Sequence, residues 1–423
     1  MPLSEPRDRD HPRAGLLTRT FLTLETFVAD PSDMYFGFHL RMNGTPPELA
    51  TLRAQVSRRV QSLPLLTHRL TLRDGHTYWE PDADFAVEHH VRHLADRTLD
   101  PRPAQALLDT PPPPDRPRWG LWLQTDGGEG WALCFLAHHA VQDATSMLHT
   151  LRVLLGPRPA HEPPPSAAGP AHAPRQKPAR DLLALLPDVL ATYLPHTRSP
   201  APDPLQPPRR ELAHASVDLG LLQTMARATG ATVNQVHLAA MAAALRDWPP
   251  TQDCASQPWW RRGPYVLVPV DTRPPHHHED FVPHLANRLG LLRIPLPCTA
   301  SNTANRLTAL MNTTSRRHMA RHRDALRTLT EDTPDRVASW VLQRLTDPRS
   351  VAMTASHVRT QGPVSVLGAH VADITAIPWL PPSHNCFTLL TTHDGVARLS
   401  ALTTTAHENP QRLVELWADA LAE

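Results

Sequence analysis

Two adjacent histidines followed by a carboxylate are the residues best suited to acid–base chemistry. His138 and His139 come directly after an apolar run from Trp131 to Ala137, and Asp143 lies four residues after His139. A neutral imidazole with an ordinary pKa of about 6.5 can accept a proton from an attacking alcohol or amine and then return it to a leaving group. A continuous apolar strand is buried on both faces, so it would place this pair at the rim of a hydrophobic core.

The two imidazoles cannot have the same role. Neighbouring residues on a strand point to opposite faces, so only one of the pair can face a given cavity and the other must support it. This geometry also argues against His138, His139 and Asp143 as ligands of one metal ion, since no second motif with ligand spacing accompanies them. Three histidines at 276–278, beside two acidic residues and several prolines, are interpreted as an exposed loop.

A proline-rich stretch divides the elements that must position this motif. The chain has 47 prolines in 423 residues, and 15 of them fall between residues 157 and 208. Proline removes a hydrogen-bond donor and fixes φ, so this density predicts an extended linker in which only residues 181–193 can form a short helix. We therefore expect an N-terminal subdomain over residues 1–155, a crossover linker over 156–210 and a C-terminal subdomain over 211–423.

Helix and strand patterns alternate on both sides of this linker, which indicates an α/β or α+β protein. Apolar spacing predicts helices from Leu49 to Val60, from Ser216 to Gly230 and from Thr232 to Trp248, with Asn234 hydrogen-bonded near the start of the last. A weaker helical pattern covers residues 103–108. The predicted strands cover residues 34–42, 119–124, 131–137, 265–270, 289–296, 383–392 and 396–403.

Composition excludes several classes of function. The 42 basic and 41 acidic residues leave a formal net charge of +1, so there is no global footprint for nucleic acid. Lys177 is the single lysine and lies in the linker, which argues against Schiff-base chemistry. The four cysteines, Cys134, Cys254, Cys298 and Cys386, are far apart, so we expect reduced thiols rather than a zinc cage or disulfides.

No segment of the sequence is suited to crossing a membrane. Residues 1–13 contain no apolar run, and the most apolar internal stretch, residues 182–194, is interrupted by Pro187 and Asp188. A bilayer requires about 20 consecutive apolar residues. We therefore expect a cytoplasmic protein, for which peripheral contact with a membrane stays open.

The spacing His138-His139-x-x-x-Asp143 resembles the HHxxxDG motif of the CoA- and carrier-protein-dependent acyltransferase and condensation-domain superfamily. The flanking segments 79–91 and 115–122 are similar to those that precede the motif in the bacterial wax ester synthase/diacylglycerol acyltransferase family. Further similarities follow the linker in the order of that family, and they cover nearly the whole chain: residues 230–234, 268–273, Asn287 ahead of Leu296-Pro297, and Gly362-Pro363 ahead of residues 367–369.

This resemblance implies an α/β fold of two chloramphenicol-acetyltransferase-like subdomains, each a mixed sheet flanked by helices, with an active-site tunnel at their interface. It implies that His139 is the general base, that His138 belongs to the catalytic motif and that Asp143 has a structural role. The donor would be an acyl-CoA or a phosphopantetheine-linked acyl group on a carrier protein, and the acceptor an alcohol or amine. No bound cofactor and no covalent enzyme intermediate are implied.

Four residues are candidates for substrate binding by the same resemblance: Ala144, Arg273, Asn287 and His357. Ala144 stands where the family has glycine, and His357 stands where the family usually has asparagine, which indicates an altered acceptor side. The methyl group of Ala144 would either narrow the channel or be tolerated in ordinary backbone geometry. Arg273 would either pair with Asp143 or hold a turn.

Three functions remain open at this point. The first is an acyltransferase that forms an ester or amide from an acyl thioester. Since the chain is shorter and more proline-rich than storage-lipid enzymes, specialised metabolism fits as well as lipid storage. The second is a binding or scaffold protein that has lost turnover, and the third is a cyclase or dehydratase acting on a carrier-bound intermediate. Release of free thiol distinguishes the first from the others.

Overall fold

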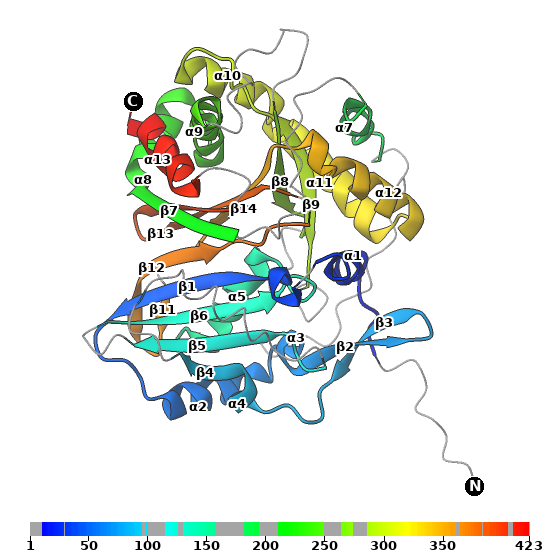
Figure 1. Cartoon of the computed structure of the whole chain (residues 1–423), viewed down its shortest axis with the longest axis vertical. Helices are drawn as coiled ribbons and strands as arrows, with labels where there is room; N and C mark the ends of the chain where they lie inside the picture. The colour runs from blue at the N-terminus through cyan, green and yellow to red at the C-terminus, as the bar shows by residue number, and fades with distance from the viewer. Residues whose placement is uncertain are drawn as a thin grey trace.

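Two six-stranded mixed sheets, with helices packed on them, make up the core of the molecule (Figure 1). The computed structural model describes residues 11–28, 30–94, 99, 115–125, 130–157, 182–193, 210–248, 264–273, 286–360, 362, 364–382, 384–404 and 409–422. The sheet that carries the histidine motif has the order β11-β12-β1-β6-β5-β4. The second sheet has the order β7-β14-β13-β10-β8-β9, and β2 and β3 form a separate hairpin.

The first sheet draws strands from both halves of the chain. It contains β1 (Tyr35–Asn43), β4 (Val91–Leu94), β5 (Trp119–Thr125), β6 (Gly130–His138), β11 (Ser365–Val366) and β12 (Ala369–Ile377). β12 pairs antiparallel with β1, with Phe38 opposite Ala376. The strands β11 and β12 therefore extend from the C-terminal part of the chain into the N-terminal sheet. The helices and the hairpin of the N-terminal part are α1 (Leu16–Glu25), η1 (Pro31–Met34), α2 (Leu49–Val60), α3 (Pro64–Thr67), β2 (His68–Arg73), β3 (His76–Pro81), α4 (Val87–His90) and α5 (Ala144–Leu155).

The second sheet is built entirely from the C-terminal part of the chain. Its strands are β7 (Arg210–Asp218), β8 (Tyr265–Asp271), β9 (Leu289–Pro295), β10 (Met353–Arg359), β13 (Cys386–His393) and β14 (Val396–Thr404). β10 runs parallel to both of its neighbours, and the other pairs are antiparallel. The accompanying helices are α7 (Leu186–Ala191), α8 (Leu219–Thr229), α9 (Val233–Asp247), α10 (Thr303–Thr313), α11 (Arg316–Glu331), α12 (Asp335–Leu345), η4 (Pro348–Ser350) and α13 (Pro410–Ala422).

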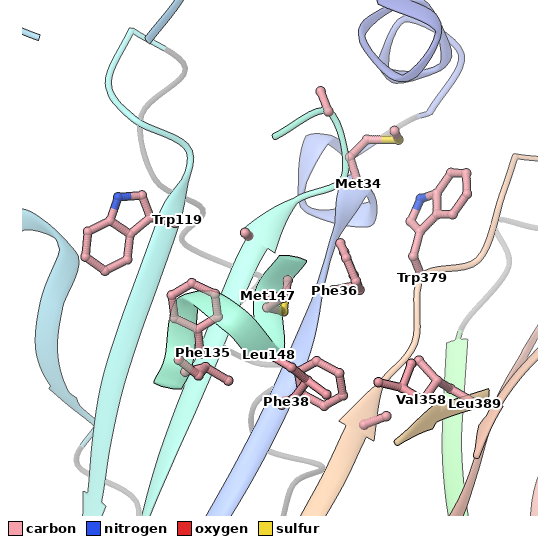
Figure 2. Close-up of a cluster of buried hydrophobic side chains, with 14 of the residues drawn as sticks. Met34, Phe36, Phe38, Trp119, Phe135, Met147, Leu148, Val358, Trp379 and Leu389 are labelled. Atoms are coloured by element: carbon pink, nitrogen blue, oxygen red, sulfur yellow. The ribbon is translucent and has the colours of Figure 1, made fainter. Parts of the chain in front are cut away.

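One continuous hydrophobic cluster joins the two sheets. Phe36 and Phe38 of β1 lie close to Met147 and Leu148 of α5, with Val358 and Leu389 of the second sheet on the other side (Figure 2). A second cluster fills the space between the second sheet and the helices α9 and α13. The motif is therefore held on the side of the first core that meets the C-terminal half.

Most of the elements expected from the sequence are present, and one prediction is wrong. The helix from Leu49 to Val60 is α2, and the predicted strands correspond to β1, β5, β6, β8, β9, β13 and β14 within a few residues. The expected helix from Ser216 to Gly230 begins only at Leu219, because residues 210–218 form β7 and pair with β14. Alternate apolar residues at 213, 215 and 217 mark that strand. The segment 103–108 lies outside the described residues.

Two smaller expectations have different outcomes. Cys134, Cys298 and Cys386 are buried, the thiols of Cys134 and Cys386 are free as expected, and Cys254 lies outside the described residues. The start of α9 is capped by Thr232 rather than Asn234: the Thr232 side chain accepts from the Gln235 amide, and the Gln235 side chain accepts from the Thr232 amide in return. Gln235 therefore serves as the second member of a capping box.

Candidate active site

The histidine motif occupies the connection between β6 and α5. His138 is the last residue of β6 and lies opposite Tyr35 of β1. His139 begins the connection, where its amide donates to the carbonyl of Met34 at 2.9 Å. Asp143 is the N-cap of α5, and its Oδ1 atom accepts from the Ser146 amide at 2.9 Å. The motif is thus fixed at one end by sheet pairing and at the other by a helix cap.

Aromatic rings enclose the imidazole of His139. The ring stacks on Phe21 with 4.0 Å between centroids and on Phe36 with 4.4 Å, and it meets Trp379 edge-on at 4.7 Å. Figure 2 shows Phe36 and Trp379 facing each other from β1 and from the segment after β12. Burial among these rings lowers the pKa of His139 to about 4, against weaker opposing effects of its own carbonyl, Asp143 and Asn287. The imidazole is therefore neutral at physiological pH, as a general base must be.

His139 is more enclosed than the sequence led us to expect. The resemblance implies an active-site tunnel at the interface of the two halves, with His139 as its base, but the residue is only 7% exposed. Three side chains cover the ring: Phe36 lies on β1, Trp379 lies in the segment after β12, and Phe21 lies on α1. A substrate must therefore approach along the ring edge or displace part of this cover.

His138 faces a different set of partners. Its Nδ1 atom accepts from the Ala140 amide at 3.0 Å, which leaves Nε2 as the protonated nitrogen. Nε2 lies 3.6 Å from Oε1 of Glu25, and the other Glu25 oxygen accepts from Arg118 at 2.7 Å. Burial lowers the pKa of His138, although Glu25 opposes that shift. Only one histidine of the pair faces the aromatic enclosure, and His138 supports the connection that carries His139.

Asp143 ties the motif to the C-terminal half. Its Oδ2 atom accepts from Arg273 Nη2 at 2.8 Å and from the Arg288 amide at 2.8 Å. Arg273 also donates to Asp271, to the Ala286 carbonyl and to the Ser146 hydroxyl. Despite its burial, the Asp143 carboxyl has a lowered pKa because Arg273 and these donors stabilise its charge. Both alternatives for Arg273 are present: it pairs with Asp143, and it holds the turn after β8 through Asp271, which accepts from its amide and its guanidinium.

Asn287 reaches the main chain of the base. Its Nδ2 atom donates to the His139 carbonyl at 2.6 Å, so a residue just before β9 holds the connection between β6 and α5. Both residues are buried. The contact indicates that Asn287 fixes the backbone at His139.

The other two candidate residues differ in position. Ala144 is the first residue of α5 and has no positive φ, so the departure from glycine requires no unusual backbone geometry. His357 lies on β10 and shares its strand face with Met353 and Ala355, which pack in the C-terminal core. Its Nε2 atom is 3.4 Å from the Thr392 hydroxyl, and burial lowers its pKa to about 4. The structure does not bring His357 to the histidine motif.

The sequence did not single out the residues that surround the motif. Phe21 and Glu25 come from α1, Arg118 from the position just before β5, Phe36 from β1 and Trp379 from the segment after β12. A signal existed for α1, since Leu16, Leu17, Phe21 and Leu24 have helical spacing. Nothing in a linear pattern could show that this helix lies on the histidine ring.

Neither a metal centre nor a membrane-spanning helix is found among the described residues. They contain no group of three or more histidine, cysteine or acidic side chains arranged to hold a metal ion. The histidines at 276–278 lie outside this part of the chain. Within the same part, none of the helices combines the length and the apolar character needed to cross a bilayer.

Comparison with known protein families finds a similarity in the C-terminal part of the chain. Residues 285–423 match the model of the WS/DGAT C-terminal domain. This region is similar to that domain. Two Mycobacterium tuberculosis proteins, provisionally named diacylglycerol O-acyltransferases, are also similar: one is 30% identical over 26% of this chain and 25% of its own length, the other 28% over 43% and 46%. The matches therefore span less than half of either relative. The family resemblance drawn from the sequence is confirmed.

Solved structures match over almost the whole chain. The wax ester synthase/diacylglycerol acyltransferase from Marinobacter aquaeolei VT8 has a TM-score of 0.63 at 18% identity, with 97% of this chain and 98% of that chain covered. The first condensation domain of the calcium-dependent antibiotic synthetase, in complex with a substrate analogue, has a TM-score of 0.71 at 19% identity, with 99% and 96% covered. These similarities confirm the predicted fold class of two chloramphenicol-acetyltransferase-like subdomains.

Proposed function

We propose that this protein is an acyltransferase that transfers an acyl group from a thioester to a hydroxyl or amine acceptor, with His139 as general base. The observation that carries the proposal is a neutral, buried imidazole in a connection fixed by Asp143, Arg273 and Asn287. The match to the WS/DGAT C-terminal domain supports the same class of reaction.

The reaction needs one proton carrier and no covalent enzyme intermediate. The unprotonated nitrogen of the neutral His139 ring is the base. It takes the proton from the acceptor as the acceptor oxygen or nitrogen attacks the thioester carbonyl, and it returns the proton to the departing thiolate. General-base catalysis of this kind contributes about 10²- to 10⁴-fold in rate.

The donor we propose is an acyl group on a phosphopantetheine thiol, as CoA or a carrier protein would present it. A starter condensation domain of rhizomide synthetase, similar in fold with a TM-score of 0.69, was solved in complex with C8-CoA and Leu-SNAC. That support is an analogy of fold at 15% identity.

The experiment measures thiol release from a panel of acyl-CoA and acyl-N-acetylcysteamine thioesters, each supplied with primary alcohols and amines. We expect release by the wild type, loss of at least about 100-fold in His139→Ala, and a smaller loss in His138→Ala. His89→Ala, at an exposed position of α4, is the matched control and should retain full activity. Equal rates for wild type and His139→Ala would refute the assignment of the base.

The enclosure of His139 favours one alternative, a binding protein of the same fold without turnover. The ring is 7% exposed among Phe21, Phe36 and Trp379. The same thioester panel tests it. Saturable binding by calorimetry with no thiol release under any acceptor would support the binding protein and reject the enzyme.

A further inference from the structure

We infer that helix α1 is part of the catalytic centre. In this arrangement Glu25 is a positioning residue, which fixes the orientation of α1 so that Phe21 packs on the imidazole of His139. This inference rests on the proposed function of His139 as the base. It extends the site beyond the histidine motif to a separate helix near the start of the described chain. Two contacts, four residues apart on one helix, reach the two histidines separately.

The first contact is between Phe21 and His139. The rings are nearly parallel, with 19° between their planes and 4.0 Å between centroids, and Phe36 stacks on the opposite face of the imidazole at 23°. Phe21 also meets Trp379 edge-on at 5.3 Å. Because both faces of the imidazole are covered, its χ2 rotation is restricted and water is excluded from both sides. A substrate group can then reach the nitrogens only in the plane of the ring.

The second contact is between Glu25 and the pair Arg118 and His138. Oε2 of Glu25 accepts from Arg118 Nη1 at 2.7 Å, and Oε1 lies 3.6 Å from His138 Nε2. These interactions outweigh the effect of burial and lower the pKa of Glu25 to about 2, so the carboxylate is charged at any working pH. The Arg118 carbonyl also accepts from the His138 amide at 3.0 Å. Glu25 therefore joins the last residue of α1 to the strand end that carries the motif.

A third contact anchors α1 on the C-terminal half. Arg19 forms a two-pronged ion pair with Asp335, the first residue of α12, with N···O distances of 2.6 and 3.0 Å. Leu16, Leu17 and Phe21 belong to the hydrophobic cluster shared by the two sheets. The helix α1 therefore contacts both halves of the molecule: Glu25 binds it to the N-terminal half, and Arg19 binds it to the C-terminal half.

The chemical consequence concerns the protonation of the base. The titratable groups that face His139 are Asp143, whose charge Arg273 compensates, and His138; Phe21, Phe36 and Trp379 contribute no charge. Burial is the largest cause of the low pKa of His139. Removing the Phe21 ring admits water to one face of the imidazole, so the pKa of His139 must rise from about 4 toward 6.5.

The first experiment compares Phe21→Leu, Phe21→Tyr and the matched control Phe27→Leu, since Phe27 lies beyond the end of α1 and is 71% exposed. For Phe21→Leu we expect kcat to fall by about 10-fold through loss of ring orientation, with KM changed less than about 2-fold. The acid limb of the kcat profile should move up by about one pH unit or more. Phe21→Tyr should restore both properties, and Phe27→Leu should match the wild type.

The second experiment tests the seat of the helix. Glu25→Gln keeps the size of the side chain and an acceptor oxygen but loses the charge that holds Arg118. We expect the changes to resemble those of Phe21→Leu but to be smaller: a lower kcat, and an acid limb of the kcat profile that moves to higher pH. Glu48→Gln, at an exposed position before α2, is the matched control and should change neither property.

Titration of His139 by NMR separates this inference from the proposed function. Histidine labelled at Cε1 is titrated in wild type and in each variant, and the His139 signal is assigned by its absence in His139→Ala. A higher pKa in Phe21→Leu supports the role of α1 even if the wild type releases no thiol, in which case only the proposed function fails. An unchanged His139 pKa, or a kcat that rises in Phe21→Leu because the ring merely obstructs the site, would overturn the inference.

Discussion

Arg273 is the side chain of the C-terminal half that pairs with Asp143 of the motif. We predict that Arg273→Lys lowers the free energy of unfolding by about 3 kcal/mol, because an ammonium group cannot reproduce the contacts to Asp143, Asp271 and the Ala286 carbonyl in a buried site. Urea unfolding followed by tryptophan fluorescence measures this loss.

The exposed pair of Arg246 and Asp247 supplies the control. Arg246→Lys makes the same chemical change at a partly exposed position on α9 and should cost less than about 1 kcal/mol. If Arg273→Lys lowered the free energy of unfolding by no more than Arg246→Lys does, the buried contacts of Arg273 would not be strongly stabilising, and the prediction would be contradicted.

The pH dependence of the reaction should reflect the low pKa of the buried His139 imidazole. Because the pKa of His139 is lowered to about 4, the base stays neutral as the pH falls through 6.5, and activity should decline only near pH 4. Initial rates of thiol release, corrected for the folded fraction at each pH, measure this limb. A decline centred near pH 6.5 would contradict the buried position of the ring.

At the scale of residues, the sequence was sufficient for the motif and insufficient for its surroundings. The spacing of His138, His139 and Asp143 pointed to a base and a supporting partner, and the role of Asp143 as a helix cap follows from its place before α5. The enclosure of the ring could not be predicted, since Phe21 and Trp379 are more than 100 residues from His139 in the chain and reach it only through tertiary packing.

Ala144 is the first residue of helix α5, so we expect the choice between alanine and glycine at this position to affect mainly the stability of the helix. We predict that Ala144→Gly lowers the free energy of unfolding by up to about 1 kcal/mol and changes the rate of thiol release less than about 2-fold, because no positive φ is needed at this position. Ala320→Gly, at an exposed position inside α11, is the matched control for the cost of glycine in a helix. If thiol release by Ala144→Gly were instead much faster than by the wild type, the methyl group would be shown to narrow the site.

At the scale of elements, periodicity identified helices and strands better than it identified their boundaries. Residues 49–60 form α2 over the full predicted range because one stripe of apolar residues faces the core. Residues 216–230 were assigned wholly to a helix, yet the first three belong to β7, since Val217 and Leu219 fit a period of two as well as a helical turn. These residues form a strand because β7 pairs with β14, and β14 is too distant in the sequence for a local pattern to reveal this pairing.

At the scale of the molecule, buried neutral histidines make stability depend on pH. Burial lowers the pKa of His90, His139, His357 and His384 to about 4 and that of His237 to about 3. The unfolded chain binds protons near pH 6.5, before the folded protein does, so the free energy of unfolding must fall as the pH drops from about 6.5 to 4.

His237 allows one contribution to this trend to be isolated. We predict that His237→Gln, which keeps an acceptor for Trp417, reduces the loss of unfolding free energy between about pH 7.5 and pH 5 by about 1–2 kcal/mol. Urea unfolding at both pH values measures the difference within each variant. His89→Gln, at an exposed position, should leave the pH dependence as it is in the wild type. An unaltered dependence in His237→Gln would contradict a neutral, buried imidazole at that position.

The two strands that leave the C-terminal half to complete the N-terminal sheet have a mechanical consequence. Because β12 pairs with β1 along much of its length, pulling the halves apart would have to unzip a ladder of backbone hydrogen bonds and not merely separate two surfaces. A chain cut between residues 157 and 182 should accordingly migrate as one particle in native electrophoresis and as two fragments in detergent.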